Sequence, residues 1–115
     1  MIYSKNTDGI DPDSCTNVLI EDYVYCGGDD AVAVKSGWNF AGQRFNMSSR
    51  NITVRNAVSG CRGGFTIGSE MSGGVSDVSH TPPSNRLTPS DITCLHPEKS
   101  EHPPKTQTLS VPVKR

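Results

Sequence analysis

The sequence has little of what an independent globular core or a membrane segment requires. Only 33 % of its 115 residues are hydrophobic and 6 % are aromatic. No apolar stretch approaches the roughly 20 residues that span a bilayer, and the first residues lack the apolar core of a signal peptide. The formal net charge is −1, so basic residues are not in excess. We therefore expect no membrane partner and no nucleic-acid partner, and we doubt that the chain closes a self-sufficient core.

A metal-binding pattern is also absent. The cysteines are Cys15, Cys26, Cys61 and Cys94. They contain no Cys-x-x-Cys pair, and together with the three histidines they match no spacing typical of a zinc site. We therefore predict no metal site. Cysteines of this kind fit a secreted protein better, although the sequence does not determine how they would pair.

Glycine and aromatic residues are missing from the C-terminal third. Residues 79–115 contain no glycine, tryptophan, tyrosine or phenylalanine, and seven of the eight prolines lie there. This segment sustains neither a helical nor a strand period. We therefore predict an ordered part, residues 1–78, followed by a proline-rich and disordered tail, residues 79–115.

What the chain does contain is a repeated pattern of short strands. Residues 17–22 recur as residues 51–56, 34 residues later, and residues 28–36 recur as residues 61–69, 33 residues later. Repetition at such a period is typical of a solenoid, in which each coil packs only on its neighbours. We therefore predict an all-β fold, a parallel β-helix of about three coils.

The intervals between repeats are unequal. Residues 8–10 precede residues 30–32 by only 22 residues, a plausible length for one coil, so the longer intervals contain an extra loop. That loop, residues 37–49, is rich in aromatic side chains, which either form one wall of a binding cleft or cover an exposed sheet edge. These side chains are Trp38, Phe40 and Phe45.

Apolar positions alternate along each predicted strand and are expected to stack from coil to coil. The predicted interior comprises Val18, Ile20, Val32, Val34, Ile52, Val54, Phe65 and Ile67. Stacked strands lie roughly 4.8 Å apart, which would place Asp8 beside Asp30. Because two ionised carboxylates repel each other, this neighbourhood brings no stability and indicates a functional site.

The candidate site centres on residues 27–30, Gly-Gly-Asp-Asp, immediately before a buried strand. The glycines permit a sharp turn there. In an ideal strand Asp29 and Asp30 would point to opposite faces, so the turn must be distorted for both to join Asp8. The other interpretation of this stretch alone is a solvated surface turn.

Three motifs resemble, in the same order, those of the polygalacturonase group, glycoside hydrolase family 28. They are Asn6-Thr7-Asp8, Gly28-Asp29-Asp30 and Gly68-Ser69-Glu70-Met71-Ser72-Gly73-Gly74. The resemblance covers residues 4–78. It implies a right-handed, single-stranded parallel β-helix that hydrolyses α-1,4-galacturonosyl links in pectin with inversion and without a cofactor. It also implies that the full-length protein is extracellular or in the cell wall.

The resemblance assigns roles to individual residues. Asp29 would be the general acid that protonates the leaving oxygen, while Asp8 and Asp30 would hold and deprotonate the attacking water. Arg62 stands where the family commonly has histidine, and it either binds a uronate carboxylate of the substrate or is a surface arginine. Lys35 either contributes to substrate binding or is a solvated lysine at a strand end.

Two departures from the family bear on activity. The family's Arg-Ile-Lys motif has no counterpart in this sequence, and the family has several coils before its Asn-Thr-Asp motif. We therefore expect a truncated, monomeric form of a pectin hydrolase. The alternative is a catalytically inactive β-helix fragment that binds pectin or another uronic-acid polysaccharide, or that is only structural.

Overall fold

The computed structural model describes residues 5–60 and 63–84. This part of the chain consists mainly of short strands. In chain order the elements are β1 (Thr16–Glu21), β2 (Val24–Tyr25), β3 (Val32–Val34), α1 (Asn39–Phe45), β4 (Ser49–Arg55), β5 (Val58–Ser59), β6 (Phe65–Ile67) and β7 (Val75–Thr81). The predicted all-β class is confirmed.

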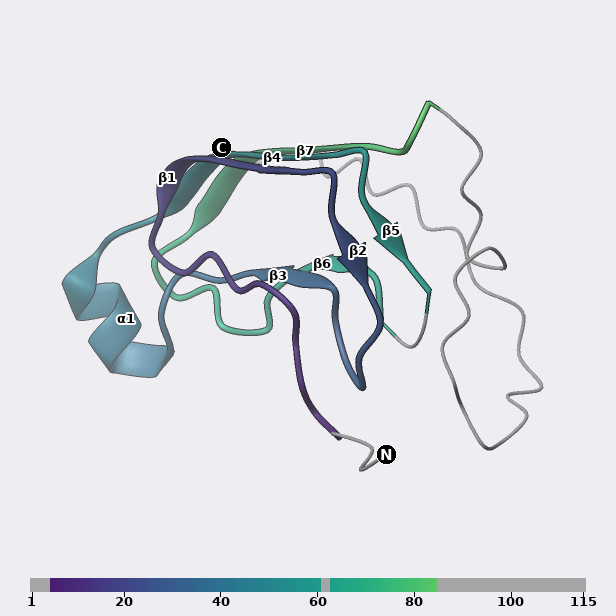
Figure 1. The fold of residues 1–115 in the computed structure, drawn as a ribbon. Coiled ribbons are helices and arrows are strands. Elements are labelled where there is room, and N and C mark those ends of the chain that lie inside the picture. Colours follow the sequence, from purple (N-terminus) through teal and green to yellow (C-terminus); the bar gives the residue numbers. More distant parts are fainter. Residues whose placement is uncertain (1–4, 61–62, 85–115) are drawn as a thin grey trace.

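The strands form three parallel sheets, which the chain visits in a fixed order. β1, β4 and β7 form the first sheet, β2 and β5 the second, and β3 and β6 the third. Figure 1 shows these sheets on three sides of the molecule, with each strand beside its equivalent from the next pass of the chain. We call one pass through the three sheets a circuit.

The strand registers reproduce the sequence repeats. Val18 pairs with Ile52, an interval of 34 residues, and Val32 pairs with Phe65, an interval of 33. An isolated bridge joins Ile10 to Val32, 22 residues later. The repeated segments are therefore neighbours in space, as the sequence predicted.

Each strand of the first sheet contains one residue in the left-handed region. Asn17, Asn51 and Asp77 have φ values of 59°, 55° and 54° and lie between the paired positions of β1, β4 and β7. The side-chain amide of Asn51 donates a hydrogen bond to Asn17 Oδ1 at 2.8 Å. Asparagine and aspartate tolerate this conformation better than most residues. Their recurrence at one level allows the three strands to bend alike and remain paired.

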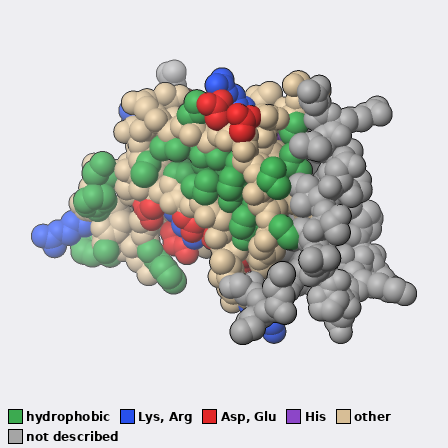
Figure 2. Space-filling view, viewed as in Figure 1, with side chains coloured by type: hydrophobic (Ala, Val, Ile, Leu, Met, Phe, Trp, Pro, Cys, Tyr) green, Lys and Arg blue, Asp and Glu red, His purple; other side chains and the backbone are tan. Residues whose placement is uncertain are grey.

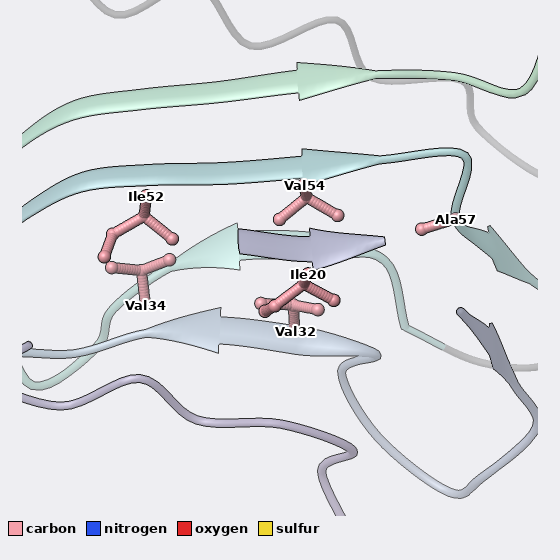
Figure 3. Close-up of a cluster of buried hydrophobic side chains, with 6 residues drawn as sticks. All are labelled: Ile20, Val32, Val34, Ile52, Val54 and Ala57. Carbon is pink, nitrogen blue, oxygen red and sulfur yellow. The ribbon is translucent and has the colours of Figure 1, made fainter. Parts of the chain in front are cut away.

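The hydrophobic core lies between the sheets. Its buried cluster, drawn in Figure 3, comprises Ile20, Val32, Val34, Ile52, Val54 and Ala57. Val18, Phe65 and Ile67 are partly buried and pack against it. All eight predicted interior residues thus belong to this cluster or contact it, and Ala57 is an addition that the strand pattern did not reveal.

The segment predicted as a loop between the circuits contains the helix α1. It follows Gly37, which has a φ of 72°, and ends at Asn46, whose backbone N–H donates to the Gly42 carbonyl. A Cβ built on Gly42 would lie 2.6 Å from the backbone carbonyl carbon of Gly37, so the two glycines allow the helix to pack against the strand end. Within residues 5–60 and 63–84, no helix has the length and apolarity needed to cross a membrane.

The aromatic residues of this segment are largely exposed. Trp38, Phe40 and Phe45 have relative exposures of 66 %, 73 % and 63 %. Side chains covering a sheet edge would be buried against it, so that interpretation is wrong for these three. Their contribution to a binding cleft stays a prediction.

The last strand, β7, extends beyond the boundary expected from composition. It continues through Thr81, which pairs with Arg55 of β4. The predicted end of the ordered part at Val78 therefore falls inside a strand. Proline has no N–H to donate, so Pro82 marks the end of pairing better than the loss of glycine does. The remainder of the predicted tail, residues 85–115, lies outside the described residues.

A buried hydroxyl linking circuits provides a test of this packing. Ser49 is fully buried; its hydroxyl donates to the Lys35 carbonyl at 2.6 Å and accepts the Cys15 N–H at 3.1 Å. Ser49→Ala removes the acceptor of that N–H and should lower the free energy of unfolding by about 1–3 kcal/mol. Urea unfolding followed by circular dichroism measures the change. The exposed Ser79→Ala is the control, and equal unfolding midpoints for the two variants would contradict the assignment.

Candidate active site

The acid-bearing segments of two successive circuits lie side by side. The Gly9 N–H donates to the Asp30 carbonyl at 2.8 Å. The bridge between Ile10 and Val32 is parallel, so Asp8 and Asp30, each two residues earlier, occupy the same level. This is the backbone register that the sequence predicted for the two acids.

Asp29 and Asp30 precede β3, and their carboxylates have different partners. Asp29 Oδ1 accepts the backbone N–H of Asp30 at 3.1 Å, within the same turn. Asp30 Oδ2 accepts the hydroxyl of Thr66 at 2.8 Å. Because Thr66 belongs to β6, the next circuit holds the carboxylate of Asp30 from the other side.

The hydroxyl of Tyr25 lies between the two acid-bearing turns. It donates to the Thr7 carbonyl and packs on Gly27 of the Asp29 turn. Burial raises the pKa of Tyr25, and the charges of Asp8, Asp29 and Asp30 raise it further, while the Asp29 N–H opposes the change. The backbone register places Asp8 beside Asp30, and Asp29 directly precedes Asp30, so the three predicted acids belong to adjacent turns.

A second group of charges surrounds the ammonium of Lys35. Its Nζ lies 2.8 Å from Asp11 Oδ2, 3.3 Å from Asp8 Oδ2 and 3.6 Å from Glu70 Oε2. The hydrogen bond to Asp11 raises the pKa of Lys35; burial opposes this and the hydrogen bond to Asp8 adds to it. Lys35 therefore stays charged. In Figure 2, acidic side chains gather around a basic one in the hollow beneath the central hydrophobic patch.

The predicted substrate-binding residues have different outcomes. The side chain of Lys35 is only 20 % exposed and meets three carboxylates, so the interpretation as a solvated strand-end lysine is wrong. Arg62 lies outside the described residues, and its role stays a prediction.

Among the residues that the structure describes, no cluster of histidine, cysteine and acidic side chains is arranged to hold a metal ion. Cys26 is disulfide-bonded, whereas Cys15 is a free thiol.

Sequence reasoning missed three residues of this site. In the repeats Thr66 is only one position of a strand, yet it pairs in register with Ala33 and its hydroxyl donates to Asp30. Asp11 is the second such residue. The 22-residue interval pairs Asp13 with Lys35, so it also brings Asp11, two residues before Asp13, near Lys35. The third, Tyr25, had no signal in the repeats, because its contacts depend on the shapes of two turns.

Gly63 tests how the acid-bearing turn is supported. Its φ is 84°, and a Cβ built there would lie 2.0 Å from the Asp29 carbonyl oxygen and 2.6 Å from the Asp30 Cα. Gly63→Ala must therefore displace the turn, lower stability and change the NMR signals of both aspartate amides. Gly64→Ala is the matched control, since a Cβ at Gly64 meets nothing within 4 Å. Unchanged amide signals in Gly63→Ala would contradict this account.

Comparison with known proteins gives several similar sequences. A "Probable polygalacturonase" of Vitis vinifera is 48 % identical over 79 residues, which are 67 % of this chain and 16 % of that protein. A "Polygalacturonase" of Ralstonia nicotianae is 36 % identical over 77 residues, 67 % of this chain and 13 % of that protein. An "Endo-polygalacturonase" of Pectobacterium carotovorum subsp. carotovorum is 37 % identical over 70 residues, 61 % of this chain and 16 % of that protein. No solved structure matches significantly.

The family assignment rests on a longer match. The model of the family described as "Glycosyl hydrolases family 28" aligns with residues 2–86. This range includes both acid-bearing turns and the Lys35 cluster described above. The chain covers less than a fifth of each of the three relatives, so the match concerns one part of such a protein. Because the family model covers most of this sequence and its entire candidate site, the chain belongs to glycosyl hydrolases family 28.

Proposed function

We propose that this chain is part of a polygalacturonase-type hydrolase that cleaves α-1,4-galacturonosyl links in pectin with inversion. The observation that carries the proposal is the parallel register that places Asp8 beside Asp29 and Asp30, with the Gly9 N–H donating to the Asp30 carbonyl at 2.8 Å. Chance rarely gathers three acids from two circuits, and their mutual repulsion gives no structural benefit. Family membership supports a glycosidase, and the names of the relatives support a pectic substrate.

The proposed fold of the whole protein is a right-handed parallel β-helix, with each circuit as one coil. Three parallel sheets visited in a constant order support this interpretation. Crossovers between parallel strands are right-handed in about 98 % of cases, which favours the same hand here. The proposed division of this chain places the partial β-helix through Thr81 and the proline-rich tail after it.

The proposed mechanism uses the different surroundings of the acids. Asp8 accepts from the ammonium of Lys35 and Asp30 accepts from the hydroxyl of Thr66. Donors of this kind hold a carboxylate in place as an acceptor, which suits residues that bind and deprotonate a water. Asp29 then supplies a proton to the leaving oxygen. Inversion requires acid and base about 6.5–9.5 Å apart, a gap that residues from neighbouring coils can provide.

Substrate recognition requires cations for the uronate carboxylates. We assign this role to Arg62, whose guanidinium can bind a carboxylate through two hydrogen bonds. Lys35 is already engaged with three carboxylates, which argues for a contribution through Asp8 and not through direct contact with substrate.

Pectin is a cell-wall polysaccharide, and the disulfide-bonded Cys26 fits an oxidising compartment. We therefore place the whole protein outside the cell or in the cell wall.

Asp29→Asn tests the general acid in a full-length protein that carries this segment. The amide has nearly the shape of the carboxyl group but cannot donate the required proton. We expect kcat on polygalacturonate to fall by about 10²–10⁴-fold with little change in KM. Reducing-sugar release measures both constants. Asp77→Asn, which changes an exposed acid on β7, is the matched control and should leave both unchanged.

A substrate whose leaving group needs no protonation separates the roles of the acids. It should restore turnover in Asp29→Asn but not in Asp8→Asn or Asp30→Asn, because the latter two lack water activation. Equal rescue of all three variants would contradict the assignment of Asp29. If the unmodified protein binds polygalacturonate without releasing sugar, the inactive, polysaccharide-binding alternative is correct.

Chelation tests the proposal that carboxylates alone perform the chemistry. Acid and base catalysis by paired carboxylates requires no metal ion. We therefore expect prolonged dialysis against EDTA to leave kcat on polygalacturonate unchanged, measured before and after removal of the chelator. Activity that disappears with EDTA and returns with an added divalent cation would contradict the mechanism.

A further inference from the structure

The residue of greatest further interest is Tyr25, at the end of β2. Its hydroxyl donates a hydrogen bond to the Thr7 carbonyl and packs on the turn that carries Asp29, where a Cβ built on Gly27 would lie 1.8 Å from it. Thr7 immediately precedes Asp8. One side-chain atom thus contacts the backbone before the first acid and the turn of the second.

Packing fixes the ring of Tyr25 between the two acid-bearing turns. A Cβ built on Gly27 would lie 1.8 Å from the Tyr25 hydroxyl oxygen, and one built on Gly9 would lie 2.8 Å from its Cδ2. Both turns therefore approach the ring more closely than any residue with a side chain allows. On another side the ring stacks on Tyr23, with centroids 6.2 Å apart and planes inclined by 24°.

We propose that Tyr25 is a positioning residue that sets the separation of Asp8 and Asp29. This inference rests on the proposed function, in which Asp8 helps to activate the water and Asp29 donates the proton. Inverting hydrolysis needs a defined gap between acid and base, and small displacements of catalytic groups cost large factors in rate. A hydroxyl that bonds the backbone before Asp8 and packs on the Asp29 turn is a bridge between the two turns, and this bridge fixes that gap.

The ionisation of Tyr25 is consistent with this role. Burial and the three surrounding carboxylates raise its pKa, so the phenol stays neutral and keeps the proton that it donates to Thr7. A phenolate would lose this hydrogen bond and would add a fourth negative charge to the site. The bridge is therefore intact over the acidic and neutral range.

Tyr25→Phe keeps the ring and removes only the bridge. Tyr23→Phe is the matched control, because the Tyr23 hydroxyl donates to the Ala31 carbonyl at 3.4 Å and packs on Gly9, but it makes no hydrogen bond to Thr7. In the full-length enzyme we expect Tyr25→Phe to lower kcat on polygalacturonate at least tenfold with little change in KM, and to shift its pH profile. Tyr23→Phe should change neither. Equal kinetics for the two variants would overturn the proposal.

A second measurement separates this proposal from the proposed function. NMR titration of aspartate side chains in this chain reports the surroundings of Asp8 and Asp29 without any activity. Tyr25→Phe should shift both titrations and weaken hydrogen-exchange protection of the Asp29 amide, whereas Tyr23→Phe should not. If the full-length enzyme is inactive but these shifts occur, the proposed function fails and the positioning role stands. If the titrations are unchanged, the positioning role fails.

A third variant covers the case in which Tyr25→Phe does not fold. A difluorotyrosine placed at position 25 keeps the shape of tyrosine but ionises at lower pH. The bridge should then break at lower pH, so activity should decline on the alkaline side earlier than in the unmodified enzyme. An alkaline limb that does not move would overturn the proposal.

Discussion

The parallel register between successive circuits is the constraint on which the candidate site depends. The hydrogen bond from Gly9 to Asp30 belongs to the same register that pairs Ile10 with Val32 and Val32 with Phe65. Side chains alternate along a strand, so a shift of one residue would exchange the buried and exposed faces. The apolar residues would then lose their core. The stability of the core thus enforces the position of the acids.

The fold holds together charges that would otherwise repel. Asp8 contributes to both groups, since it lies near Tyr25 and also accepts from Lys35. Lys35 further meets Asp11 and Glu70, so one ammonium serves carboxylates from separate segments of the chain. The carboxylates raise the pKa of Lys35, so the ammonium and these acids stabilise one another while the acids repel each other. Backbone pairing holds their segments side by side.

The sequence was informative where structure follows from periodicity. Repeats at fixed intervals predicted the strand pairs, and alternation predicted the interior, because both depend on backbone geometry that any residue in the repeat shares. The sequence was uninformative where the structure depends on a close contact between two particular residues. The helix α1 requires Gly42 to pack on Gly37, and the bridge from Tyr25 requires glycine in both neighbouring turns. Composition likewise placed the boundary at Val78, although pairing of β7 continues to Thr81.

The strand that follows Asp29 and Asp30 has neighbours on both sides, unlike the outer strands of the first sheet. β1 and β7 are the outer strands of the first sheet, and an apolar cavity of about 520 Å³ lies between β6 and β7. By contrast, Val32 of β3 is bridged to Ile10, and Lys35, directly after β3, is bridged to Asp13, while β3 pairs with β6 on the other side. Val32 and Val34 are accordingly 1 % exposed. Repeats are stabilised by their neighbours, so the strand that follows Asp29 and Asp30 is supported on both sides. The positions of Asp29 and Asp30 therefore depend least on whatever covers the outer strands.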